Sequence, residues 1–244
     1  MVAAKDCRSA TLGALVAEDS RIANVLDTFK IDYCCGGRRT LAEAAQERHI
    51  GVDVLVSAIE KLRPRMGEDE NREWASPEDL IRHIVDRHHR YVREMAPVIS
   101  GWLAKIRDHH GARHPELEAV SDAFEALTAD LSVHMLKEEH VLFPYVNALA
   151  RASRTHDDPV TAPFGTVRHP VRAMEDDHRL AGLLMARIRL LTNDFQPPDD
   201  ACRTYALCLA ELARFERDLH RHVHLENHVL FPRAIELEDR TARR

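Results

Sequence analysis

The chain has 244 residues, of which 45% are hydrophobic, so it can bury a substantial core. Its formal net charge is −6, and it shows no concentrated basic patch and no long apolar run. We therefore expect neither nucleic acid nor a membrane as a partner. Five cysteines outside any secretory framework, and no signal peptide, predict reduced thiols and a cytoplasmic location.

The first 62 residues are expected to form a small helical domain that contains a cysteine pair. Alanine, leucine, glutamate and arginine dominate the chain and glycine is scarce, which favours an all-α fold. Ser20 is positioned to cap a first helix, and Thr40 with Glu43 makes a capping box for a second. The three helices expected in this domain span 21–30, 41–49 and 52–62.

The polar stretch 63–75 is predicted to be a linker, followed by a four-helix bundle over 76–239. Ser76 as N-cap and Pro77 at the first helical position mark a strong helix start. The helices of the bundle are expected at about 76–108, 115–150, 168–193 and 200–238. Two prolines, Pro144 and Pro232, fall inside the second and fourth helices and should bend both.

One segment of the bundle occurs twice. Residues 130–144 and 218–232 share the pattern D-L-x-x-H-x-x-x-E-x-H-V-L-F-P. Residues four apart on a helix lie on the same face, so each copy presents a histidine and a glutamate together. Two such faces turned toward each other would surround one point with two imidazoles and two carboxylates, as in a dinuclear metal site within a helical bundle.

Single histidines upstream of the two copies extend the set. His89 precedes its copy's histidine by 45 residues, and His178 precedes its own by 44. His88 competes with His89 but lies one residue off the repeat, and Glu139 competes with Glu138 but is not four residues from His134. The predicted metal ligands are His89, His134, Glu138, His178, His222 and Glu226.

These ligand types favour a pair of iron or manganese ions bridged by the glutamates and by an oxo or hydroxo group. No cysteine belongs to the pattern, which disfavours a thiolate zinc site. Asp130 and Asp218 lie four residues before a ligand histidine and are predicted to accept hydrogen bonds from His134 and His222. The repeated His140 and His228 should point away from the metals, because they lie ~200° round the helix from the ligand face.

Cys34 and Cys35 stand next to each other in the turn C-C-G-G and are candidate redox thiols. A strained vicinal disulfide, a metal or cluster site, a nitrosylated pair and two free thiols are all open interpretations. The neighbouring Arg38 and Arg39 should favour thiolate at neutral pH. We expect the bundle alone to bind the metals, with the thiols remote from them.

The doubled H-x-x-x-E with F-P resembles the hemerythrin-like (HHE) cation-binding domain. Residues 12–45, with DYCCGG, resemble the N-terminal domain of the iron–sulfur cluster repair di-iron proteins, the repair of iron centres family. MEDDH (174–178) and HLENHVLFPRA (224–234) resemble that family's third and fourth ligand regions. The family's iron ligands fall on the six residues above, and its cysteine pair falls on Cys34 and Cys35.

The resemblance implies a stress-response protein that binds two iron ions. It would repair iron–sulfur clusters damaged by nitric oxide or peroxide, by donating iron to client proteins. The alternatives are a di-iron nitric oxide reductase that produces N2O, and a protein that binds or senses O2 or NO. Family members are often dimers, so a homodimer is an option.

Overall fold

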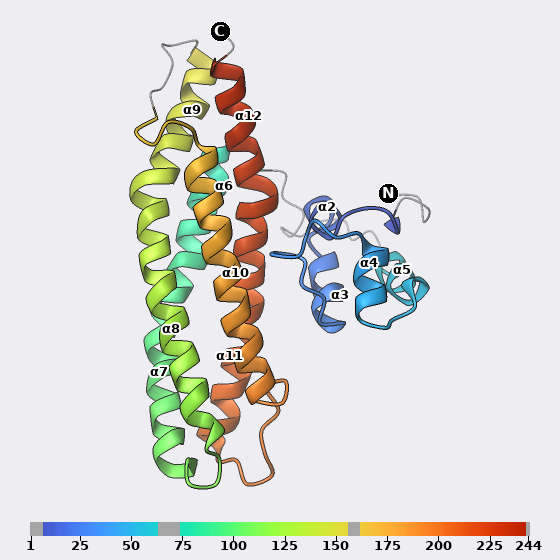
Figure 1. The fold of residues 1–244 in the computed structure, drawn as a ribbon, viewed down its shortest axis with the longest axis vertical. Helices are drawn as coiled ribbons and strands as arrows, with labels where there is room; N and C mark the ends of the chain where they lie inside the picture. Colours follow the sequence, from blue (N-terminus) through green and yellow to red (C-terminus); the bar gives the residue numbers. More distant parts are fainter. Residues whose placement is uncertain (1–6, 63–73, 156–161, 243–244) are drawn as a thin grey trace.

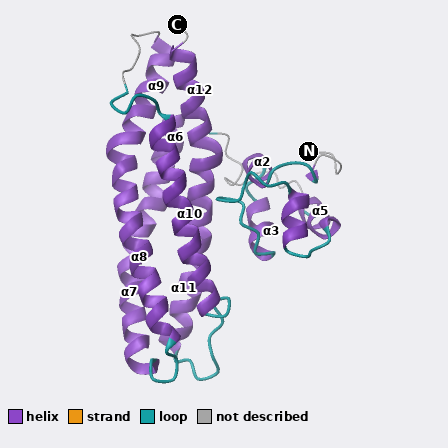
Figure 2. Cartoon of the chain, in the orientation of Figure 1, coloured by secondary structure: helices purple, strands orange, loops and turns teal. Residues whose placement is uncertain are grey.

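The computed structural model describes residues 7–62, 74–155 and 162–242 (Figure 1). Within these residues the secondary structure is helical, and extended residues pair only in one isolated bridge between Thr11 and Thr40 (Figure 2). The prediction of an all-α protein is therefore confirmed. The expected linker, 63–75, lies outside the described residues except for Trp74 and Ala75.

The small N-terminal domain packs four short helices around apolar side chains: α2 (Leu12–Glu18), α3 (Ile22–Thr28), α4 (Leu41–Glu47) and α5 (Val52–Glu60). The capping box of Thr40 and Glu43 is confirmed. Helix α2 was not predicted from the sequence, and the Thr11 side chain caps it by accepting from Ala14 N at 3.3 Å. The expected capping role of Ser20 differs from the structure, because Arg21 occupies the N-cap position of α3.

The bundle consists of long arms that run side by side (Figure 1). There are four arms, and three of them change from α- to π-helical geometry along their length. The arms are α6 (Pro77–His83), η2 (Ile84–His89) and α7 (Arg90–His110); α8 (Glu116–Lys137), η3 (Glu138–Leu142) and α9 (Phe143–Thr155); α10 (Arg168–Leu191); and α11 (Arg203–Leu225), η4 (Glu226–Leu230) and α12 (Phe231–Ala242). Ser76 caps the first arm, as predicted, by accepting from Asp79 N at 3.1 Å.

The π-helical segments η3 and η4 end two residues before the two prolines. Phe143 N donates to Glu138 O and Phe231 N donates to Glu226 O, each five residues back. Proline lacks a backbone N–H and its ring crowds the carbonyl of the preceding turn, so a wider turn at this point accommodates it. The structure thus shows a π-helical turn on each arm just before Pro144 and Pro232. Each turn begins at one of the predicted glutamate ligands.

Two apolar regions fill the interior of the bundle, and the polar centre described below lies between them. One includes Phe124 and Phe215 and continues into the small domain. The other includes Phe143 and Phe231 and extends toward the free ends of α9 and α12. Within the described residues, no helix is both long and apolar enough to cross a bilayer.

The small domain stands beside the bundle, and its loop between α3 and α4 reaches the bundle surface (Figure 1). His228 of η4 lies between Gly13 and Gly37 of this domain, and its Nε2 is 2.9 Å from Cys34 O. A Cβ atom on Gly13 would lie 2.5 Å from the imidazole Nδ1, so glycine permits this close approach. His228 points away from the centre, as expected, and it is partly buried against the small domain.

Candidate metal centre

The six predicted ligands lie together in the interior of the bundle, and each has at most 2% of its surface exposed. They come from all four arms. His89 ends η2, His134 lies near the end of α8, and His178 lies in α10. His222 is near the end of α11, while Glu138 and Glu226 begin η3 and η4. The helical repeat thus brings together side chains that are more than 130 positions apart in sequence.

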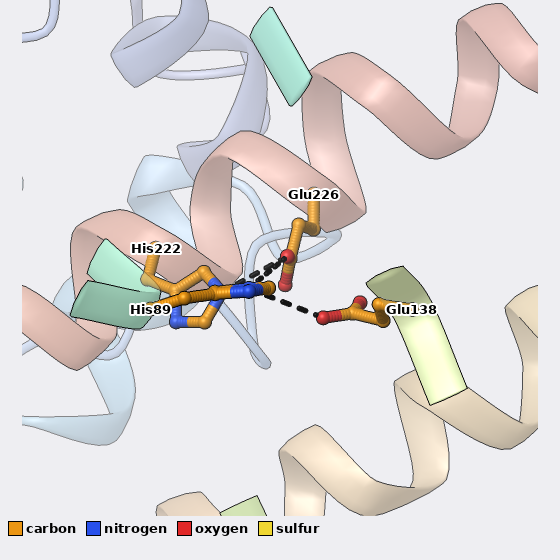
Figure 3. Close-up of side chains that lie close together, drawn as sticks. All are labelled: His89, Glu138, His222 and Glu226. Carbon is orange, nitrogen blue, oxygen red and sulfur yellow. Dashed lines mark hydrogen bonds and ion pairs between the residues drawn. The ribbon is translucent and has the colours of Figure 1, made fainter. Parts of the chain in front are cut away.

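The donor atoms form two groups that share both carboxylates. In the first group, His89 Nε2 is 3.1 Å from His222 Nε2 and 3.4 Å from Glu138 Oε2, and His222 Nε2 is 2.9 Å from Glu226 Oε1 (Figure 3). In the second, His134 Nε2 lies 3.0 Å from His178 Nε2. Glu138 Oε2 and Glu226 Oε2 lie 3.3 and 3.1 Å from these two nitrogens, respectively.

These separations fit the donors of a metal ion. Two ligand atoms at right angles, each about 2.1 Å from one ion, are about 3.0 Å apart, close to the distance between the paired Nε2 atoms. Both oxygens of Glu138 and Oε2 of Glu226 are buried without a hydrogen-bond partner. A buried, unpartnered carboxylate oxygen is costly, and a cation is the natural partner for it. The residues present therefore fit a pair of cations.

The charges of the centre are mutually dependent. Burial disfavours a charged imidazolium, yet the carboxylates of Glu138 and Glu226 raise the pKa of His89 to about 10. Glu138 likewise raises the pKa of His134 to about 9 against the effect of burial. Burial would raise the pKa of the Glu226 carboxyl, but His222 and the other imidazoles hold it well below its usual range. Both carboxylates are consequently anionic, as a cation site requires.

The outer nitrogens of the imidazoles are held by side chains that sequence spacing did not identify. Glu139 Oε1 accepts from His89 Nδ1 at 2.6 Å, and Asn227 Oδ1 lies 2.9 Å from His178 Nδ1. Asp177 Oδ2 is 3.4 Å from His134 Nδ1. Each of these partners stands on a different arm from the imidazole it contacts, so the contact depends on how the arms cross.

The expectation for Asp130 and Asp218 was wrong. Asp130 is exposed on α8 and does not contact His134. Asp218 lies 3.1 Å from His88 Nδ1, while His222 Nδ1 has no hydrogen-bond partner. A residue four positions away is displaced by about 40° round the helix, which turns the aspartate to the edge while the histidine faces inward.

A phenylalanine ring lies beside one imidazole of each donor group. Phe143 lies 5.8 Å from the His89 ring at an interplanar angle of 20°, and Phe231 lies 6.1 Å from the His178 ring at 2°. His88, the rejected alternative to His89, is buried and stacks on His222 at 5.5 Å. The two phenylalanines belong to the repeated F-P pair. The repeat in the sequence therefore marks these positions as well as the ligands.

Comparison with known proteins agrees with this arrangement. The model of the hemerythrin HHE cation-binding domain matches residues 80–234, and that of a domain of unknown function, DUF542, matches 8–63. The iron–sulfur cluster repair protein YtfE of Dickeya chrysanthemi (strain Ech1591) is 32% identical over 229 residues, which cover 93% of this chain and 97% of the relative. The repair protein ScdA of Staphylococcus haemolyticus (strain JCSC1435) is 31% identical over 210 residues, covering 86% and 90%.

The chain belongs to the family of iron–sulfur cluster repair proteins. A third relative, the probable iron–sulfur cluster repair protein of Haemophilus influenzae (strain ATCC 51907 / DSM 11121 / KW20 / Rd), is 32% identical over 209 residues. These 209 residues cover 85% of this chain and 88% of the relative. Because the matches include both the small domain and the bundle, the cysteine loop and the histidine–glutamate centre belong to one family architecture.

In this member of the repair-protein family, the cysteine loop lies against the candidate centre. Cys35 Sγ is 3.4 Å from His178 O, the backbone carbonyl of a predicted ligand. Asn227 links the two parts, because its Oδ1 contacts His178 Nδ1 and its Nδ2 donates to Cys34 O at 3.3 Å. The expectation that the thiols stand apart from the metal-binding bundle was therefore wrong.

The two thiols are free, with their sulfur atoms 3.8 Å apart. Asp32 Oδ1 accepts from the backbone N–H groups of both cysteines at 3.0 Å, which shapes the turn. The hydrogen bond with Cys35, together with burial and the charge of Asp32, raises the pKa of the Cys34 thiol well above its usual value. The expectation of thiolate was wrong for Cys34, because Arg38 pairs with Glu175 and Arg39 with Glu47 instead.

Proposed function

We propose that this protein repairs damaged iron–sulfur clusters by donating iron from a pair of ions. His89 and His222 would hold one ion, His134 and His178 the other, and Glu138 and Glu226 would contact both. The observation that carries the proposal is the sharing of both buried carboxylates by the two donor groups. The names of the relatives, iron–sulfur cluster repair proteins, supply the reaction class.

The donor set supports iron as cargo. Imidazole and carboxylate together suit iron, and the described residues place no thiolate among the six donors. Each ion would have only two imidazoles of its own, and its remaining protein ligands would be shared. Carboxylates change between bridging and terminal contacts at modest cost. Such a centre can release an ion more readily than a closed site in which every ligand serves one metal.

The cysteine loop supports a direction for release. Asp32, Cys34 and Cys35 bring their donor atoms within 4.8 Å of one another, and Cys35 adjoins His178. Beside them a pocket of about 190 Å³ is lined by Arg38, Glu175, Arg179, Asn227 and His228 as well as the two cysteines. We propose that iron passes from the centre to this pocket, where the thiols present it to a client protein.

The test is transfer of isotopically labelled iron from the loaded protein to an apo iron–sulfur protein. The Cys34→Ser/Cys35→Ser variant should keep its iron and lose most of the transfer. Cys202→Ser, which changes an exposed cysteine at the start of α11, should transfer normally. Normal transfer by the double variant would refute the role of the loop. Conversion of NO to N2O without iron transfer by the unchanged protein would instead indicate a nitric oxide reductase.

A further inference from the structure

Another pocket is lined by none of the six predicted metal ligands and by neither cysteine of the loop. Its volume is about 480 Å³, and it runs along η2, α7 and α11 beside Asn24 of the small domain. Five guanidinium groups line it: Arg87, Arg90, Arg214, Arg217 and Arg221. The only acidic residues in its lining are Glu94 and Asp218, so the pocket carries an excess of three positive charges in a chain whose net charge is −6.

Most of this charge is unpaired. Arg87, Arg90, Arg214 and Arg217 are exposed and form no ion pair with any described residue. Arg221 donates to Asn24 Oδ1 at 2.6 Å, a neutral acceptor. Asp218 accepts from His88, which uses part of its capacity to compensate the arginines. Elsewhere on the molecule arginines are commonly paired, as Arg154 is with Glu78 and Arg168 with Asp239.

The helices place these side chains in two facing rows. Arg214, Arg217 and Arg221 follow one another at intervals of three and four residues, so they share one face of α11. Arg87 and Arg90 form a shorter row on the opposite arm. The two arms run antiparallel here, as the contacts of His88 with Asp218 and of Tyr91 with Glu211 show. Two rows of like charge therefore face one pocket, an arrangement that repels itself without an anion.

We propose that this pocket binds a small polyanion that carries at least two phosphate or carboxylate groups. Guanidinium presents paired N–H donors that match either group, and such charge-assisted pairs are about twice as strong as neutral hydrogen bonds. The row on α11 extends over seven helical steps, from Arg214 to Arg221, or about 10 Å of helix. A single small oxyanion would reach only part of that row, whereas a ligand with separated anionic groups would reach both ends.

The site is built from both domains, because Asn24 and Arg221 meet at its edge. Nearby, His220 Nδ1 lies 3.3 Å from Asp27 Oδ1, which adds a second contact between the same two elements. A polyanion that neutralises the arginines removes repulsion beside this junction. It should therefore stabilise the packing of the small domain on the bundle as well as bind.

The test is calorimetric titration of the iron-loaded full chain at low ionic strength. The probes are fructose 1,6-bisphosphate, tricarballylate and inorganic phosphate, and the iron content of the protein is measured before and after each titration. The bisphosphate or the tricarboxylate should bind with one-to-one stoichiometry and about tenfold more tightly than inorganic phosphate. Which of the two binds more tightly identifies the source as a phosphate ester or a polycarboxylate.

The variant Arg214→Gln/Arg217→Gln should weaken this binding about tenfold or more. Its matched control, Arg172→Gln/Arg187→Gln, removes the same charge from exposed positions of α10 and should bind within about twofold of the unchanged protein. Arg214→Lys/Arg217→Lys keeps the charge but lacks the paired N–H donors of guanidinium. Its affinity for the polyanion should fall by an intermediate amount. Equal weakening by both glutamine variants, absence of saturable binding, or binding of poly-glutamate alone would overturn the proposal.

Discussion

Two side chains, Glu138 and Glu226, decide what the interior of this bundle can hold. Their carboxyl groups are fully buried, and three of their four oxygens have no hydrogen-bond partner. Burying an ionised carboxylate is unfavourable unless opposite charge compensates it. The surrounding imidazoles supply only part of that compensation, because protonation of one ring opposes protonation of its neighbour. The residues are thus arranged for cations rather than for the stability of an empty protein.

Replacing either carboxylate should remove metal from both groups of donors. We expect Glu226→Ala to bind fewer than about half of the ions bound by the unchanged protein, since each ion loses a ligand. The measurement is the metal-to-protein ratio after anaerobic loading with Fe(II). Glu236→Ala, on the exposed face of α12 where Glu236 forms an ion pair with Arg240, is the control and should load fully. Full loading of Glu226→Ala would remove this residue from the proposed ligands.

Glu139 should behave differently from its neighbour. It accepts from His89 Nδ1 and pairs with Arg93. Glu139 therefore orients a predicted ligand but contributes no donor atom of its own to either group. We expect Glu139→Ala to retain both ions but to bind them about 10–100-fold more weakly. Competition with a chelator of known affinity measures this change. Loss of ions equal to that in Glu138→Ala would show that the register of η3 has been misassigned.

Protons should stabilise the metal-free protein in a defined pH range. His89 and His134 have pKa values raised to about 10 and about 9, above the ordinary value of 6.5. Since the folded state binds protons that the unfolded state has released, stability falls as pH rises from 6.5 toward 10. The slope is about 1.4 kcal/mol per pH unit for each such proton. Chemical denaturation between pH 7 and 10 should show this loss in the metal-free protein and little of it after loading.

Much of the centre could be predicted at this scale because the chain repeats itself. Two copies of H-x-x-x-E give the two residues on each of two arms, and their common interval identifies His89 and His178. The partners of the outer nitrogens could not be found this way. Glu139, Asp177 and Asn227 reach imidazoles on other arms, so their roles depend on crossing geometry that spacing along one helix does not contain.

At the scale of elements, the π-helical segments set the position of the glutamates. Helical periodicity predicted the four arms closely, because long apolar stripes with strong N-caps leave little ambiguity. It could not predict η3 and η4, since the same sequence pattern describes a bent α-helix. It also missed α2, a helix of only seven residues that depends on the Thr11 cap and on packing within the small domain.

Restoring a backbone N–H after each π segment should disturb the centre more than the fold. In Pro144→Ala/Pro232→Ala, regular α-helical hydrogen bonds become available, and the turn can lose its extra residue. We expect metal affinity to fall about tenfold or more while the metal-free protein unfolds at the same or a higher temperature. Scanning calorimetry and chelator competition measure the two effects. Pro97→Ala, at the proline inside α7, is the control and should leave affinity unchanged.

At the scale of the whole molecule, the two domains are fitted together through His228. Its ring occupies space that side chains at Gly13 and Gly37 would otherwise fill, and its Nε2 contacts Cys34 O. The sequence predicted both domains but not their contact. The glycine pair was interpreted as a local turn, whereas Gly37 also admits a histidine from a helix nearly 200 positions away.

Widening this contact should expose the cysteine loop without unfolding either domain. In Gly13→Ala the new Cβ would lie 2.5 Å from His228 Nδ1, so the ring or the domain must shift. Cys34 is buried in the unchanged protein, and reaction with a thiol reagent requires exposure of its sulfur. We therefore expect Cys34 to react about tenfold faster in Gly13→Ala. Gly101→Ala, where a Cβ meets nothing within 4 Å, is the control. Unchanged Cys34 reactivity in Gly13→Ala would show that the contact does not limit access.

The sharing of Glu138 and Glu226 has a consequence for how tightly each of two iron ions would be held as they bind and leave. When one ion leaves, both carboxylates stay behind with the other, which then holds two anions alone and is less readily released. Loading passes through the same two states in reverse, so the first ion to arrive would bind more tightly than the second. Unloading would therefore proceed in two unequal steps, with one ion given up readily and its twin retained.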